Sequence, residues 1–112
     1  MKMVMAVIKP FKLDDVRNAL AQIGVSGLTA SDVTGFGRQK GQVEEYRDES
    51  FDVSFIQKTK IEIVVEDALC DKVIDTIQKM AHTGRIGDGK IFVYDITKAV
   101  RIRTGETDEA AV

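Results

Sequence analysis

The sequence has few of the side chains that build disulfides, metal sites or catalytic triads. Among its 112 residues there is one cysteine and one histidine. Because Cys70 stands alone, it cannot form an internal disulfide or a cysteine-based zinc site. With His82 as the sole histidine, most metal sites and triads that depend on histidine are also excluded. We therefore assign neither residue a chemical role.

Strong charge and long apolar runs are also lacking. The formal net charge is −2, which argues against a dedicated nucleic-acid-binding protein. Near the N-terminus, Lys2 and Lys9 enclose only six apolar residues, too few for a signal peptide or a membrane span. These features predict a cytoplasmic protein with a single domain over residues 1–112. A domain of this size has a modest core, so association with further subunits would add stability.

The spacing of the apolar residues predicts alternating strands and helices. Strands are expected at 1–9, 26–36, 56–66 and 91–96, helices at 13–23 and 69–80, and a short extended piece at 100–103. In the third strand, an apolar face alternates with a second face made of Lys58, Lys60, Glu62 and Val64. The β-α-β-β-α-β order predicts an α+β, ferredoxin-like sandwich.

One connection is too long for this compact pattern. Residues 38–54, between the second and third strands, are polar and have neither a helical nor a strand period. Hairpin loops usually have about two to five residues, and long loops in small domains are commonly functional. Because Tyr46 and Phe51 stand there among many charges, we expect an arm that docks on another molecule.

Residues 83–90 come close to a phosphate-binding P-loop. Gly84, Gly89 and Lys90 have the required spacing, but Ile91 stands where the motif needs a hydroxyl group for Mg²⁺. A helical pattern precedes the segment and a strand follows it, whereas a P-loop leads from a strand into the N-terminus of a helix. The segment is therefore expected to contact phosphates in another way, with any metal held elsewhere.

The glycines of this segment leave room for an anion to approach the backbone. Gly84, Gly87 and Gly89 lack side chains, and Arg85 and Lys90 supply positive charge. A glycine-rich turn between helix and strand is the alternative interpretation. Three glycines and two cations within eight residues favour the anion site.

Two arginines near the C-terminus could form a second anion contact. Arg101 and Arg103 would project from the same face of an extended segment, where two guanidinium groups could clamp a polyphosphate. A solvated edge strand explains them equally well.

The remaining polar candidates flank the long connection. Gln39, within the glycine- and cation-rich residues 35–41, could offer a carbonyl oxygen to Mg²⁺, although a solvated turn is the simpler alternative. Lys58 or Lys60 could bind a carboxylate ligand, or pair with Glu62 on the same strand face.

Taken together, these segments resemble the PII nitrogen-regulatory signal proteins along nearly the whole chain. The resemblance is carried by residues 8–16 (Ile-Lys-Pro-Phe-Lys-Leu-Asp-Asp-Val), 35–41 (Gly-Phe-Gly-Arg-Gln-Lys-Gly), 83–93 and 101–106. It implies a homotrimer of ferredoxin-like subunits that binds ATP or ADP in the clefts between them. Residues 37–55 would be the family's T-loop, 82–90 its B-loop and 101–112 its C-loop.

The resemblance also implies roles for individual residues. The nucleotide phosphates would be held by Arg38, Gly87, Gly89, Lys90, Arg101 and Arg103. The adenine and ribose pocket would be formed or braced by Thr29, Gly35, Glu62 and Val64. The effector 2-oxoglutarate would chelate Mg²⁺ beside ATP, with Gln39 completing the metal shell, Lys58 on the far carboxylate, and the backbone N–H groups of Ile86 and Gly87 assisting.

The function that this resemblance implies is signalling and not catalysis. The T-loop would regulate a target protein, such as an ammonium channel, a metabolic enzyme or a nitrogen regulator, and any membrane contact would pass through a channel partner. Many bacterial members carry a tyrosine that accepts a uridylyl group, but Phe51 stands here and has no hydroxyl. The alternatives are a nucleotide-processing enzyme with weak ATPase activity and an RNA-binding module, which would stack bases on sheet aromatics.

Overall fold

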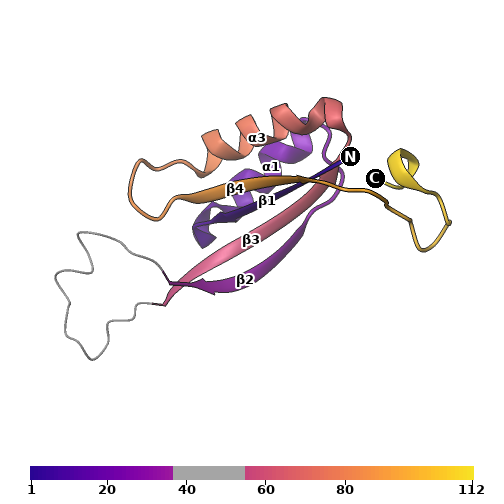
Figure 1. Ribbon diagram of the computed structural model, residues 1–112. Helices are drawn as coiled ribbons and strands as arrows, with labels where there is room; N and C mark the ends of the chain where they lie inside the picture. The colour runs from indigo at the N-terminus through magenta and orange to yellow at the C-terminus, as the bar shows by residue number, and fades with distance from the viewer. Residues whose placement is uncertain (37–54) are drawn as a thin grey trace.

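The computed structural model describes residues 1–36 and 55–112 (Figure 1). Its strands are β1 (Lys2–Ile8), β2 (Thr29–Gly35), β3 (Ile56–Val65) and β4 (Gly89–Asp95). Its α-helices are α1 (Leu13–Gln22) and α3 (Asp67–Ala81), and short 3₁₀ helices are η1 (Pro10–Lys12) and η2 (Asp108–Ala111). The predicted β-α-β-β-α-β order is confirmed.

The four strands form one antiparallel sheet in the order β2-β3-β1-β4. Both α-helices lie on the same face of this sheet (Figure 1). This layering is the predicted ferredoxin-like sandwich, in which an amphipathic helix follows the first and third strands. The second face of the sheet is covered by neither helix.

The core lies between the sheet and the helices, and its pattern follows the strand period of two. On β3, Thr59 and the alternate residues up to Val65 are buried, which confirms the predicted apolar face of this strand. The largest fully buried side chains are Ile8, Leu20, Ile61, Ile63, Ile77, Val4, Val16 and Val73. Cys70 is buried on α3, and His82 follows the last turn of that helix.

The uncovered face carries the other residues of the same strands. Met5 pairs with Glu62 on β3 and with Phe92 on β4, and Met3 pairs with Val64 and Tyr94. Since residues paired across a sheet share a face, apolar and aromatic side chains lie together on the side away from the helices. Phe92 and Tyr94 are each 48% exposed.

The prediction of an extended piece at 100–103 is wrong. Val100 makes one isolated bridge to Thr107, and the chain then turns back. The backbone N–H of Arg101 donates to the carbonyl of Glu106 (2.8 Å), and that of Gly105 donates to the carbonyl of Arg101 (2.7 Å). Gly105 has a positive φ of 77°, a conformation that favours glycine and lets the chain reverse here. Arg101 and Arg103 therefore do not share the face of a strand.

Candidate functional site

The candidate site residues gather at the two opposite ends of the sheet. We call the end where β2 stops and β4 starts the loop end, since Gly35 pairs there with Ile56 and Gly89 pairs with Ile8. Lys58, Ile86, Gly87 and Lys90 belong to it as well. We call the other end the tail end; it holds Thr29, Glu62, Val64 and Arg101. Arg38, Gln39, Tyr46 and Phe51 lie outside the described residues.

At the loop end, the carboxylate of Asp88 organises the connection between α3 and β4. It accepts hydrogen bonds from the backbone N–H groups of Thr83 and Gly84, both at 2.8 Å, and from the hydroxyl of Thr83. Hydrogen bonds to the ionised form lower a carboxyl pKa. The Thr83 hydroxyl, followed by the two backbone groups, therefore holds the pKa of Asp88 far below its usual range.

Two lysine amines lie beside this carboxylate. The Lys9 amine is 3.2 Å from Asp88 Oδ1 and 3.1 Å from the Thr83 hydroxyl. The Lys58 amine donates to the carbonyl oxygen of Gly87. Burial lowers the pKa of Lys58, the positive charge of Lys9 lowers it further, and Asp88 opposes the shift. Two cationic groups thus converge on the loop, one of them already paired with a carboxylate.

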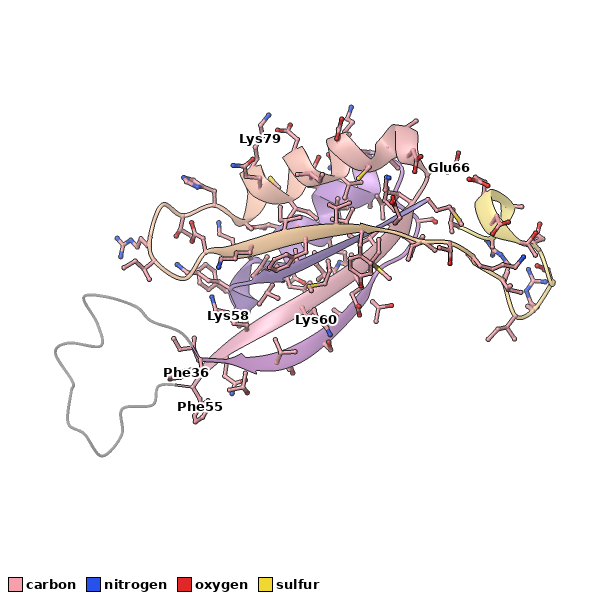
Figure 2. The ribbon with its side chains drawn as sticks, viewed as in Figure 1. Phe36, Phe55, Lys58, Lys60, Glu66 and Lys79 are labelled. Carbon is pink, nitrogen blue, oxygen red and sulfur yellow. The ribbon has the colours of Figure 1, made fainter. Side chains whose placement is uncertain are left out.

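Figure 2 places Lys58 and Lys60 along β3, with Phe36 and Phe55 at the ends of β2 and β3. The sequence left open whether Lys58 or Lys60 pairs with Glu62. Within residues 1–36 and 55–112, no ion pair joins either lysine to Glu62.

Backbone geometry, and not only access for an anion, explains why glycine stands at two positions of this loop. Gly89 has a φ of 105°, and a Cβ there would lie 1.7 Å from the carbonyl oxygen of Val7. Gly87 has a φ of 99°, and its Cβ would lie 3.4 Å from Lys9 Cε and 3.6 Å from Lys58 Nζ. Gly89 is therefore required by the backbone of β1, whereas a side chain at Gly87 would enter the space between the two lysines.

The tail end forms a hollow of about 610 Å³. Four of the predicted nucleotide-binding residues line it, namely Thr29, Glu62, Val64 and Arg101. The C-terminal residues Ala111 and Val112 complete part of its wall. Arg103 is exposed near the tip of the turn and is not among the lining residues. The structure thus joins four predicted residues but separates the two arginines.

Sequence reasoning missed Lys9, Thr83, Asp88 and Glu106 as residues that shape these two ends. The only local signal for Asp88 was its place between Gly87 and Gly89, where a short acceptor can reach neighbouring backbone N–H groups. Lys9 gave no signal, because its contact with Asp88 joins residues far apart in the sequence. The order of elements around residues 83–90 is as predicted, since α3 precedes them and β4 follows.

Comparison with known proteins settles the family. The model of the family described as nitrogen regulatory protein P-II matches residues 1–106. The chain belongs to the P-II family. It is 58% identical to nitrogen regulatory protein P-II 1 of Escherichia coli K12 over 112 residues, which cover 100% of both chains. It is equally similar to nitrogen regulatory protein P-II of Klebsiella oxytoca, and 55% identical, again over 100% of both, to nitrogen regulatory protein GlnK of E. coli K12.

Membership of the P-II family supports a role in nitrogen signal transduction, and it favours regulation over catalysis. The resemblance inferred from the four sequence segments is thereby confirmed. Neither α-helix in the described part has the length and apolar content needed to span a bilayer.

Proposed function

We propose that this P-II protein is a homotrimeric sensor that binds ATP or ADP between subunits. With Mg-ATP bound it would also bind 2-oxoglutarate, and it would regulate target proteins through the T-loop at residues 37–55. The observation that carries the proposal is the division of the predicted nucleotide-binding residues between the loop end and the tail end of one chain.

The division favours a site shared by two subunits. Thr29 and Gly35 stand at opposite ends of β2, which has seven residues, so they are about 20 Å apart along the strand. A nucleotide that contacts Lys90 and Gly87 at the loop end would therefore not also reach Arg101 of the same chain. If the loop end of one subunit faces the tail end of the next, both sets surround one nucleotide.

The uncovered face of the sheet supports association of copies. Met3, Met5, Val64, Phe92 and Tyr94 lie on it, and burial of such apolar area on association is favourable. A closed ring of identical subunits would repeat the loop-to-tail contact at each junction. A dimer with two-fold symmetry has a self-complementary interface, in which the same patch of each subunit meets its copy. The smallest closed ring built from head-to-tail contacts is therefore a trimer.

The loop end also suits a dicarboxylate. Lys58 presents an amine beside Gly87, and this amine would pair with the far carboxylate of 2-oxoglutarate. The backbone N–H groups of Ile86 and Gly87 would add donors. The described residues contain no cluster of three histidine, cysteine or acidic side chains, so oxygens of ATP and 2-oxoglutarate, with Gln39, would surround Mg²⁺.

The output would be a protein partner and not a nucleic acid. An ammonium channel, a metabolic enzyme or a nitrogen regulator fits a cytoplasmic P-II protein, and a channel would supply the only link to a membrane. Phe51 has no hydroxyl, so uridylylation at this position is chemically impossible.

Titration calorimetry and native mass spectrometry test the proposal together. We expect a trimer that binds ATP and ADP, and that binds 2-oxoglutarate only when Mg²⁺ and ATP are present. A monomer that binds ATP would contradict the shared site, and failure of 2-oxoglutarate to bind under all conditions would contradict the effector site. ATP turnover far above a slow background rate would favour the alternative, a nucleotide-processing enzyme.

A further inference from the structure

The C-terminal tail fixes one predicted phosphate contact and leaves the other free. Two backbone hydrogen bonds hold the turn at residues 101–106, and the N–H of Asp108 donates to the carbonyl of Ala99 (2.8 Å) to close a wider loop. Arg101 stands in the stem of this turn and lines the tail-end hollow. Arg103 stands near its tip and forms no ion pair with any described residue.

The carboxylate of Glu106 is held in place without help from Arg101. The hydroxyl of Thr104 donates to Glu106 Oε1 (2.8 Å) and accepts from the backbone N–H of Glu106 (3.2 Å). The first bond ties the side chain of Glu106 to Thr104, and the second ties the Thr104 hydroxyl to the backbone of the same turn. The carboxylate is therefore a fixed acceptor before any ligand arrives.

Arg101 is oriented by this acceptor. Its Nε lies 3.4 Å from Glu106 Oε1, and its Nη2 lies 3.5 Å from the carbonyl oxygen of Ala111. The Nε contact is an ion pair and the Nη2 contact is a long hydrogen bond. A guanidinium has five N–H donors in a rigid plane, so most of them remain available to a ligand. The two contacts draw the guanidinium toward the turn, and its orientation matters for a bidentate contact with phosphate.

We propose that Glu106 is a positioning residue that holds Arg101 in the geometry needed to bind the polyphosphate of a nucleotide. The inference rests on the proposed nucleotide site and adds a residue that would not contact the nucleotide itself. A carboxylate next to a phosphate-binding arginine would at first sight weaken phosphate binding through its charge. The anchoring of Glu106 by Thr104 favours orientation of Arg101 over charge repulsion as the dominant effect on phosphate binding. Because Glu106 already orders the arginine side chain in the free protein, less conformational entropy is lost when the nucleotide binds.

The test measures the affinity for Mg-ATP of the full-length protein and its variants by titration calorimetry. Glu106→Ala removes the acceptor, and we expect ATP binding to weaken about threefold, because the pair is half exposed and such pairs couple weakly. Glu106→Gln keeps a carbonyl oxygen for Arg101 and Thr104, so we expect it to restore most of the affinity. Glu109→Ala removes one negative charge from the same exposed tail and serves as the matched control, with unchanged affinity.

A double-mutant cycle separates positioning from a general loosening of the tail. In an Arg101→Gln background, Glu106→Ala should have no further effect on ATP affinity, whereas in an Arg103→Gln background the threefold loss should persist. An equal loss in both backgrounds would show that Glu106 only stabilises the tail. Tighter ATP binding by Glu106→Ala would show that its charge competes with phosphate, and this too overturns the proposal.

Thr104→Val provides a second route that leaves both charges in place. It removes the hydroxyl that anchors Glu106, and we expect a smaller loss of ATP affinity in the same direction. Should the native protein bind no ATP, the proposed function itself fails. Should the native protein bind ATP and all Glu106 variants bind it equally well, only the positioning role fails.

Discussion

The two ends of the sheet are built in different ways. At the loop end, side chains make the structure: Lys9 and Asp88 are 19% and 24% exposed, and Asp88 gathers hydrogen bonds from the residues around it. At the tail end, backbone hydrogen bonds make the turn, and the ion pair of Arg101 and Glu106 is 45% and 50% exposed. Water screens an exposed pair, so each contact there contributes less.

Because the two ends are built differently, amino-acid substitutions at them should have different consequences. A substitution of Gly89 or Asp88 at the loop end disturbs close packing or a shared hydrogen-bond network, so its effect should extend to folding as well as binding. A substitution at the tail end should alter ligand affinity by a small factor and leave folding nearly intact.

The largest effect is expected for Gly89→Ala. The new Cβ would lie 1.7 Å from the carbonyl oxygen of Val7 and 2.9 Å from its carbonyl carbon, and the positive φ adds strain. Val7 belongs to β1, which is paired with β3 on one side and β4 on the other, so its backbone cannot move aside cheaply. We therefore expect a loss of roughly 3 kcal/mol or more in the free energy of unfolding. Urea denaturation followed by circular dichroism measures it.

Gly24→Ala is the matched control for the positive φ alone. Gly24 has a φ of 101°, but a Cβ there would meet nothing within 4 Å. We expect a loss of about 1 kcal/mol, the usual cost of a left-handed alanine. Equal losses for the two variants would mean that the close contact with Val7 adds nothing to the cost of Gly89→Ala.

Lys58→Met should weaken the binding of 2-oxoglutarate and leave the binding of ATP nearly unchanged. Methionine keeps most of the side-chain volume but removes the amine beside Gly87, so 2-oxoglutarate should lose its partner for the far carboxylate. We expect at least about a tenfold loss in 2-oxoglutarate affinity, as for a charged hydrogen bond, with ATP affinity within about twofold of the native value. Lys60→Met, on the same strand face, is the control, and calorimetry with Mg-ATP present is the measurement. A comparable loss for both lysines would point to general charge and not to a defined contact.

Asp88→Asn should weaken the loop end in a pH-dependent way. The amide keeps one acceptor oxygen but loses the charge that pairs with Lys9, so the native protein should have the higher urea midpoint at neutral pH. The pKa of Asp88 is lowered by folding from an ordinary value of 3.8, so its contribution is fully present above that value. It is lost as the pH falls through the lower pKa of the folded protein.

The checking measurement is a series of urea midpoints for the native protein and Asp88→Asn. The difference between them should be constant above about pH 5 and shrink below about pH 4, because an unfolded aspartate titrates near there. A difference that stays the same down to pH 2 would sink the idea that the ionised carboxylate holds the loop.

The sequence predicted the fold well because periodicity is a local property. The alternation on β3 and the helix predicted at 69–80 needed no knowledge of distant residues, and both were confirmed. The site was predicted only in part. The contact of Lys9 with Asp88 joins the end of β1 to the connection before β4, and no pattern in either segment announces it.

The error at residues 100–103 has a similar origin. The residues from Val100 to Arg103 alternate as a strand would, but Gly105 and the hydrogen bonds of Glu106 reverse the chain. Local alternation gives a strand only where a neighbouring strand pairs with it, and among the described residues the only bridge of this segment is the isolated one between Val100 and Thr107.

The smallest effect is expected at the exposed aromatic pair of the loop end. The rings of Phe36 and Phe55 are 6.1 Å apart between centroids and tilted by 49°, yet each residue is about two-thirds exposed, at 66% and 68%. An aromatic pair contributes about 0.5 kcal/mol beyond its buried area when water surrounds it. A double-mutant cycle with Phe36→Leu and Phe55→Leu, read from urea midpoints, should give a coupling energy near this value. A coupling above about 1.5 kcal/mol would mean that the pair is covered in the assembled protein, since exposed rings do not interact so strongly. A neighbouring subunit would then contribute to the stability of the loop end. The difference in stability between the loop end and the tail end would be larger in the assembled protein than in one chain.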